Sequence, residues 1–140
     1  MGDTRHEGRV LGMDPGERRV GLAVSDPLGI TAQGLETFDR RTGDLMAHLL
    51  RVIAEYEVTE VVVGHPLSMS GRPNESSRKS EVLAHEIESA AGLPVHLWDE
   101  RLSSVEANRV LAGSRARKGA ADRVAAVLIL QGYLDSRGTE

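Results

Sequence analysis

The feature that most constrains this chain is a run of three valines, Val61 to Val63, between Glu60 and Gly64. A short β-branched run without polar alternation is typical of a strand buried on both faces, as in a parallel sheet covered by helices. The chain should therefore fold as an α/β domain around this strand. Its core must be aliphatic, because the sequence contains only one Trp, two Tyr and one Phe. The length of 140 residues is the usual size of one domain.

Hydrophobic periodicity and turn residues predict the other elements around this strand. Strands are expected at 9–14, 19–25, 30–38, 60–64 and 94–98. Helices are expected at 43–56, 78–91, 104–112 and 120–136, with a loop at 66–77 and a basic loop at 113–119. The order β-β-β-α-β-α-β-α-α gives a mixed five-stranded sheet flanked by helices. Residues 1–8 are polar and expected to be flexible, which leaves 9–137 as one domain.

Composition excludes several classes of protein. The chain has no cysteine, so disulfides, thiol catalysis and Cys-ligated zinc are excluded. We expect a cytoplasmic protein, because no apolar run is long enough to cross a membrane and the polar start does not resemble a signal peptide. The net charge of −4 counts against a broad nucleic-acid surface. Basic residues nevertheless gather locally, at Arg115 to Arg123 and at Arg72 to Lys79.

Three acids follow or open predicted elements at one edge of the expected sheet. Asp14 ends the first strand, Glu100 follows the fifth, and Asp122 opens the last helix. Ligands of open α/β sheets bind outside the carboxyl ends of the strands, so these carboxylates should meet. Carboxylates that share a site repel one another unless a cation is present, and hard oxygen ligands favour Mg²⁺ or Mn²⁺. Two such ions can clamp a phosphodiester for attack by water.

Each acid also has a simpler interpretation. Asp14 precedes Pro15 and Gly16, a typical turn sequence. An aspartate in the first turn of a helix, such as Asp122, is commonly a cap or a partner of the helix dipole. Glu100 could pair with a surface arginine. Only the joint placement of the three residues favours a metal site.

Four long segments resemble the YqgF/RuvX family: LGMDPGERRVGLAVSDPLG (11–29), VVVGHPLSMSG (61–71), LPVHLWDERLSSVEA (93–107) and DRVAAVLILQGYLD (122–135). The family comprises Holliday-junction resolvases and nucleases that mature the precursor of small-subunit ribosomal RNA. The resemblance implies a ribonuclease-H-like fold and an acidic triad whose members match Asp14, Glu100 and Asp122. It thus implies that these residues bind metal and catalyse hydrolysis. The chain departs from the family at His65 and in its short basic loop 114–119.

The resemblance implies a metal-dependent nuclease that processes the 5' end of pre-16S rRNA in ribosome biogenesis. The alternatives are a Holliday junction resolvase in DNA recombination and repair, and a non-catalytic nucleic-acid-binding module on the same fold. A nucleotide phosphotransferase is a further possibility, since sugar kinases share a related fold but normally use two such domains. The net charge and the short basic loop favour RNA over branched DNA. A resolvase would need a homodimer, whereas trimming an RNA end requires only a monomer.

Further residues near this edge are candidates for secondary roles. Lys118, Arg101, Arg117 and Arg72 are candidate contacts for nucleic-acid phosphates. Arg101 could equally pair with Asp99 or Glu100. Ser25 could bind a phosphate, and Asp26 could either support the metal site or form a turn. His65 is either a structural residue or a proton shuttle, and the 66–77 loop either a clamp or a connection.

Overall fold

The computed structural model describes residues 8–102 and 120–138. The predicted helix at 104–112 and the basic loop with Arg117 and Lys118 lie outside the described residues. The strands are β1 (Arg9–Pro15), β2 (Arg19–Ser25), β3 (Ala32–Gly34), β4 (Phe38–Asp39), β5 (Val58–His65) and β6 (Val95–Asp99). The α-helices are α1 (Leu45–Tyr56), α2 (Glu75–Ala91) and α4 (Ala120–Gly138), with short 3₁₀ turns η1 (Arg40–Thr42) and η2 (Glu100–Leu102).

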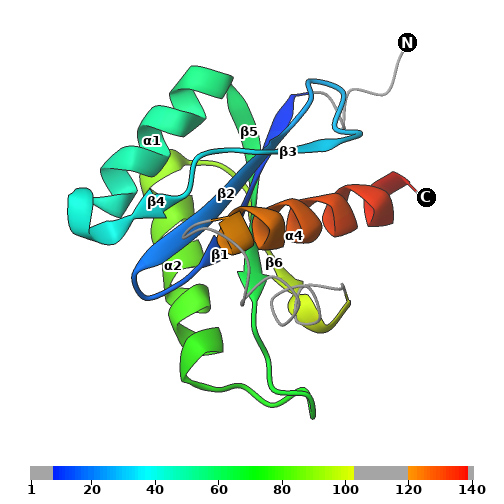
Figure 1. The fold of residues 1–140 in the computed structure, drawn as a ribbon. Helices are drawn as coiled ribbons and strands as arrows, with labels where there is room; N and C mark the ends of the chain where they lie inside the picture. The colour runs from blue at the N-terminus through cyan, green and yellow to red at the C-terminus, as the bar shows by residue number, and fades with distance from the viewer. Residues whose placement is uncertain (1–7, 103–119, 139–140) are drawn as a thin grey trace.

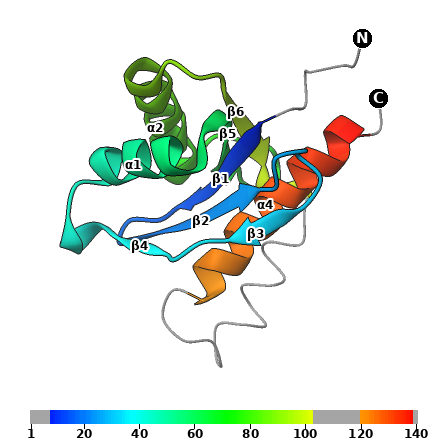
Figure 2. The same ribbon diagram turned by 90° about the horizontal axis from the view of Figure 1, so that it is seen from above.

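The strands form one mixed sheet in the order β3-β2-β1-β5-β6, and β4 also pairs with β2 (Figure 1). The β1–β2 pair is antiparallel, whereas β5 runs parallel to both β1 and β6. Helices α1 and α2 cover one face of the sheet and α4 covers the other (Figure 2). This arrangement confirms the predicted α/β fold with a hairpin followed by parallel crossovers.

The central strands are buried on both faces, as the valine run predicted. In β5, Val61 and Val63 pack in the core under α1 and α2, and Val62 packs against α4. In β1, Leu11 belongs to the same core cluster as Val61 and Val63, and Val10 belongs to the cluster that contains Val62. Since side chains alternate along a strand, even-numbered residues of β1 face α4.

The helix ends follow from their capping residues. The Asp44 side chain accepts from the amide of Ala47 at 2.8 Å, so α1 begins at Leu45. Asn74 and Ser77 form a capping box that starts α2 at Glu75, three residues before the predicted start. The 66–77 loop is therefore shorter than predicted. No helix within 8–102 or 120–138 is long and apolar enough to cross a membrane.

The predicted strand at 30–38 is wrong in one respect, because it is divided into β3 and β4. Both segments pair with β2, which gives six strands rather than five. Between them, the Leu35 carbonyl accepts a hydrogen bond from Arg123 Nε of α4 at 3.0 Å. An added Cβ on Gly34 would lie 2.5 Å from the Arg123 side chain. The strand is therefore interrupted where this arginine packs across it.

Candidate active site

Four residues lie in a row across the sheet at the level of Asp14. Asp14 pairs with Gly21 of β2, and Gly64 of β5 pairs with Trp98 of β6. The β1–β5 pairing runs to Met13 and Val63, so Asp14 and Gly64 are the next residues on neighbouring strands. Strand alternation directs this row towards α4. Asp14 is thus flanked on both sides by residues without a side chain.

Gly21 makes room for the first turn of α4. A Cβ at this position would lie 1.9 Å from the backbone oxygen of Asp122 and 3.2 Å from the Asp122 Cβ. Such distances require the absence of a side chain, because real Cβ atoms do not approach a backbone oxygen this closely. The sequence of β2 therefore brings Asp122 next to Asp14.

Gly64 makes room for the Glu100 carboxylate on the other side. A Cβ on Gly64 would lie 2.7 Å from Glu100 Oε2 and 2.6 Å from the Ile129 Cδ1 atom of α4. Glu100 stands in η2, directly after β6, and its exposed fraction is 6%. The three acids predicted from sequence thus come from β1, η2 and α4 to adjacent positions on one face of the sheet.

Two of these acids are buried, which requires compensation. The exposed fraction of Asp14 is 5%, close to that of Glu100. Transferring a carboxylate from water to a buried site is costly unless an opposite charge or hydrogen bonds offset the lost hydration. Asp14 and Glu100 both interact with other groups of the protein, and their carboxylate oxygens are of the kind that binds a divalent cation.

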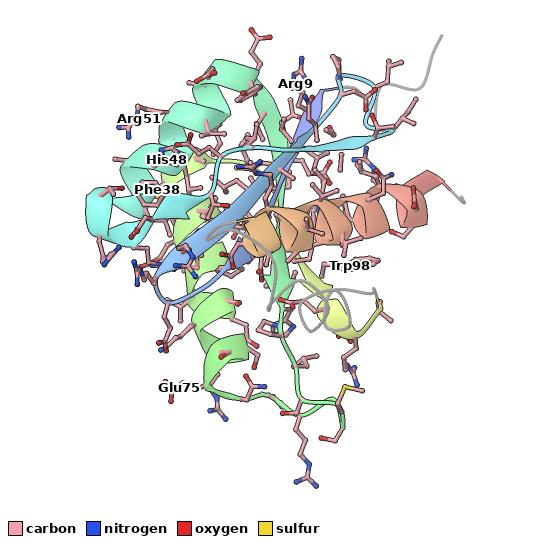
Figure 3. The ribbon with its side chains drawn as sticks, in the orientation of Figure 1. Arg9, Phe38, His48, Arg51, Glu75 and Trp98 are labelled. Atoms are coloured by element: carbon pink, nitrogen blue, oxygen red, sulfur yellow. The ribbon has the colours of Figure 1, made fainter. Side chains whose placement is uncertain are left out.

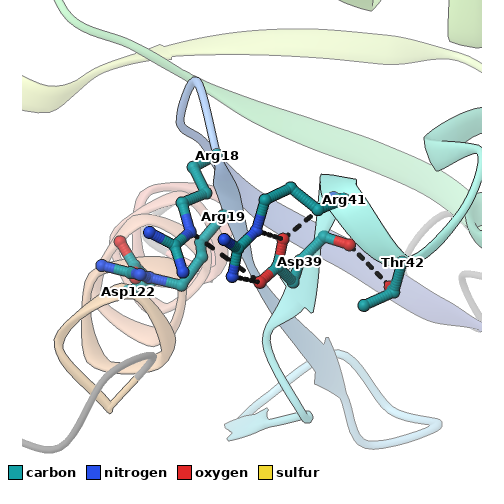
Figure 4. A network of polar contacts seen from close by, with 6 residues as sticks. All are labelled: Arg18, Arg19, Asp39, Arg41, Thr42 and Asp122. Atoms are coloured by element: carbon teal, nitrogen blue, oxygen red, sulfur yellow. Dashed lines mark hydrogen bonds and ion pairs between the residues drawn. The ribbon is translucent and has the colours of Figure 1, made fainter.

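Asp122 makes an ion pair with Arg19 in this structure. Arg19 Nε donates to Asp122 Oδ2 at 3.2 Å, and the exposed side-chain fractions are 32% and 27% (Figure 4). Among the described residues, no three His, Asp or Glu side chains are arranged as a group that could hold a metal ion. The three acids fit Mg²⁺ or Mn²⁺ in ligand type and in backbone position. A metal bound by all three acids would compete with Arg19 for the Asp122 carboxylate.

The other acidic candidates at this edge have structural partners. Asp26 accepts from the amides of Ile30 and Thr31 at 2.7 and 2.9 Å, and these bonds hold the pKa of Asp26 below its usual value. Ser25 accepts from the Val10 amide at 2.8 Å and donates to the Asp26 carbonyl. These contacts favour the turn interpretation of Asp26 and give Ser25 a role within the sheet.

Of the predicted phosphate contacts, Arg101 and Arg72 lie within the described residues. The Arg101 guanidinium donates to Asp99 at distances down to 2.7 Å, and these bonds lower the pKa of Asp99. Arg101 thus pairs with Asp99, one of the two partners considered above, and also donates to the Met69 carbonyl. Arg72 is exposed. His65 Nε2 lies 2.8 Å from Glu81 of α2, on the face opposite the acids.

Sequence reasoning missed an arginine cluster next to Asp122. Arg41 donates to Asp39 at 3.1 Å and Arg18 lies 3.9 Å from the same carboxylate, close to the Arg19–Asp122 pair (Figure 4). The Arg41 hydrogen bonds lower the pKa of Asp39 to about 2. The runs GERR (16–19) and DRR (39–41) were the available signal. Only the pairing of β2 with β4 shows that they are neighbours.

A pocket lies on the other face of the sheet from the three acids. Its volume is about 670 Å³, and it is lined by Gly16 of the turn after β1, by Arg40 of η1 and by residues of α2 that include Arg78 and Lys79. Lys79 is paired there with Glu17 and Glu75 at 3.3 and 3.2 Å. The pocket is therefore separate from the acid site, although both adjoin the turn that follows Asp14.

The fold and the acids together define a ribonuclease-H-like protein with a carboxylate site on the α4 face. The solved structure of Thermus thermophilus RuvC in complex with a Holliday junction substrate matches with a TM-score of 0.60. The match has 22% identity and covers 94% of this chain and 96% of that chain. The likeness confirms the ribonuclease-H-like fold.

The sequence comparisons identify the family. The model of the RuvX family, described as Holliday junction resolvase, matches residues 8–136, and the chain belongs to this family. A Koribacter versatilis protein named "Putative pre-16S rRNA nuclease" is 51% identical over 138 residues, covering 95% of this chain and 90% of its own. A Lachnospira eligens protein of the same name is 46% identical, with coverages of 92% and 98%.

Proposed function

We propose that this protein is a divalent-metal-dependent nuclease in which Asp14, Glu100 and Asp122 bind the metal and catalyse hydrolysis. The observation that carries the proposal is the row in which glycines flank Asp14 and the vacated space receives Glu100 and Asp122. Gly21 admits the backbone of Asp122, and Gly64 admits both the Glu100 carboxylate and the Ile129 side chain. Both acidic residues therefore approach the sheet where a larger residue would exclude them.

The three acids have distinct tasks. When bound, Mg²⁺ or Mn²⁺ would activate the attacking water and stabilise the leaving oxygen. Asp14 lies on the central strand and has little freedom to move, so it provides the fixed ligand. Glu100 is held by η2 between β6 and α4, and Asp122 approaches from the first turn of α4. Water is restricted around Asp14 and Glu100 because both are buried.

The names of the relatives favour RNA as the substrate. We propose that the chain processes the 5' end of pre-16S rRNA, as a cytoplasmic enzyme of ribosome biogenesis. The family description supports a Holliday junction resolvase as the second candidate. The candidates differ in assembly, since two symmetric cuts in a junction need a homodimer, whereas one RNA end can be trimmed by a monomer.

Positive side chains near the acids are the proposed contacts for nucleic-acid phosphates. They include Arg18 and Arg41 of the arginine cluster. The sequence candidates Arg72, Arg101, Arg117 and Lys118 are further proposed contacts, of which Arg117 and Lys118 lie outside the described residues. Arg18 and Arg41 are exposed and share one acid, Asp39, so their charges exceed that of their partner. A local cationic surface is compatible with a net charge of −4.

The proposal is tested by incubating the purified protein with precursor 16S rRNA and with a four-way DNA junction, each with Mg²⁺, Mn²⁺ or EDTA. We expect cleavage of the RNA near the mature 5' end with metal and none with EDTA. Solution mass measured in parallel distinguishes a monomer from a dimer. Preferred, symmetric junction cleavage by a dimer would favour the resolvase instead.

Binding without cleavage of either substrate would support the non-catalytic module. The phosphotransferase alternative predicts Mg²⁺-dependent binding of ATP, which calorimetry on the same preparation measures. The nuclease proposal predicts that ATP does not bind.

A further inference from the structure

Arg19 connects the second strand to the active-site helix. It lies on the face of β2 that also carries Gly21, the residue that admits the Asp122 backbone. Its guanidinium contacts the Asp122 carboxylate at 3.2 Å, across 103 positions of sequence. One strand therefore contacts both the backbone and the side chain of this proposed metal ligand.

The ion pair and the proposed metal site compete for the same carboxylate. Arg19 lies 3.2 Å from the Asp122 carboxylate, and within the described part of the chain no three acids or histidines form a group that could hold a metal ion. A divalent ion bound by Asp14 and Glu100 would attract Asp122 more strongly than one guanidinium does, because it carries twice the charge at shorter distance. A partly exposed ion pair is weak and readily exchanged.

We propose that Arg19 is a positioning residue that exchanges partners during the reaction. In the metal-free protein it neutralises Asp122 and keeps it near Asp14. When metal takes the Asp122 carboxylate, the released guanidinium binds a phosphate of the nucleic-acid strand beside the scissile bond. This inference rests on the proposed function, because it requires that Asp122 bind metal.

The chemistry of Arg19 suits both partners. A guanidinium presents its donors in a plane that matches carboxylate and phosphate groups equally well. About a third of the Arg19 side chain is exposed, so substrate can reach it without unfolding of the sheet. Arg18 and Arg41 lie next to it and would extend the binding surface along the strand (Figure 4).

The exchange predicts two opposite effects when Arg19 is replaced by Gln. Mg²⁺ should bind more tightly, because no cation competes for Asp122 and the three carboxylates repel one another more strongly. Nucleic acid should bind less tightly, because the variant has no guanidinium to bind the phosphate. If Arg19 had a purely structural role, its replacement would weaken both Mg²⁺ binding and nucleic-acid binding, because α4 would shift and misplace Asp122.

The test is a Mg²⁺ titration by calorimetry, without nucleic acid, of the wild type, Arg19→Gln, Arg19→Lys and the control Arg51→Gln. Arg51 is an exposed arginine of α1, away from the acids (Figure 3). We expect Arg19→Gln to bind Mg²⁺ about 2- to 5-fold more tightly, the equivalent of an exposed ion pair. Its affinity for an RNA oligonucleotide with Ca²⁺ present should fall about tenfold, as for one charged hydrogen bond.

Arg19→Lys keeps the charge and should fall between the wild type and Arg19→Gln in both measurements. It also replaces Arg19→Gln in the test if thermal melting shows that the latter does not fold. Equal or weaker Mg²⁺ binding by the Arg19 variants, or unchanged RNA affinity, would overturn the exchange. Asp14→Asn in the same titration separates the two proposals, because Mg²⁺ binding equal to wild type there would refute the metal site itself.

Discussion

At the scale of single residues, the proposed site depends on the absence of side chains at the two positions that flank Asp14. Gly21 and Gly64 have no conformational need to be glycine, since neither has a positive φ angle. They are needed because Asp122 and Glu100 occupy the space where their Cβ atoms would be. The proposed catalytic site thus depends on two glycines that would not touch the reacting atoms.

Replacing Gly64 by Ala should displace Glu100 and leave the fold intact. The new methyl group would lie 2.7 Å from the Glu100 carboxylate and 2.6 Å from Ile129, so both side chains must move. We expect a stability loss of about 1–3 kcal/mol, typical of overpacking, and a fall in kcat of about 100-fold. Urea denaturation and single-turnover cleavage measure the two effects.

Gly43→Ala is the matched control. No atom lies within 4 Å of a Cβ at Gly43, and its φ of 168° is extended backbone that alanine also adopts. Its stability and cleavage rate should match the wild type. Equal kcat in Gly64→Ala and Gly43→Ala would show that Glu100 is not needed where the structure places it.

At the scale of elements, α4 is fixed to the sheet at both ends. Its first turn lies on β2 through Gly21 and Arg19, and its last turns lie on β5 through Glu60. Glu60 accepts from Tyr133 and from Arg137, the latter at 2.7 Å, and lies 2.9 Å from His96. Because α4 carries Asp122, these distant contacts help to set the position of the proposed active site.

Replacing Glu60 by Gln should destabilise the protein strongly. The exposed side-chain fractions of Glu60 and Arg137 are 17% and 13%, so the change leaves a largely buried guanidinium without its counter-charge. We expect a loss of about 3 kcal/mol in the free energy of unfolding. Glu75→Gln, an exposed acid that pairs with Lys79, should change it by less than about 0.5 kcal/mol. Similar losses in the two variants would contradict this account of α4.

Tyr133 makes the same contact sensitive to alkaline pH. Burial and the hydrogen bond to Glu60 raise the pKa of Tyr133 to about 12 from its ordinary value of 10.0. The unfolded chain therefore loses this proton first, and stability should be full below pH 10 and fall as pH rises towards 12. Tyr133→Phe should lack this part of the decline in urea denaturation between about pH 9 and 12. Parallel declines in both proteins would refute the assignment.

The arginine cluster on the β1–β2 turn and η1 should contribute to RNA affinity through charge. Removing one arginine that neutralises a phosphate reduces the slope of log affinity against log salt by about 0.7–0.9. We expect this reduction in Arg18→Gln and Arg41→Gln, measured by fluorescence anisotropy in an Asp14→Asn background. Arg51→Gln removes the same charge from α1 and should leave the slope unchanged. An equal effect of all three would indicate only a change in net charge.

At the scale of the whole molecule, much of the architecture could be predicted from the sequence. The valine run correctly indicated a strand buried on both faces, and helical periodicity located α1, α2 and α4. The division of the third strand could not be predicted, because it depends on Arg123, which is far away in sequence. The Arg19–Asp122 pair and the roles of Gly21 and Gly64 were missed for the same reason, because they depend on which residues the strand register and the packing of α4 bring together.

The central claim is that three acids from β1, η2 and α4 act as one metal-binding unit. Single-turnover cleavage of precursor 16S rRNA by Asp14→Asn, Glu100→Gln, Asp122→Asn and the double variant Asp14→Asn/Asp122→Asn tests it most directly. Residues that act as a unit give non-additive losses. We predict a fall of at least about 100-fold in each single variant and no further fall in the double variant. Wild-type cleavage by any single variant, or losses that multiply in the double variant, would contradict the claim.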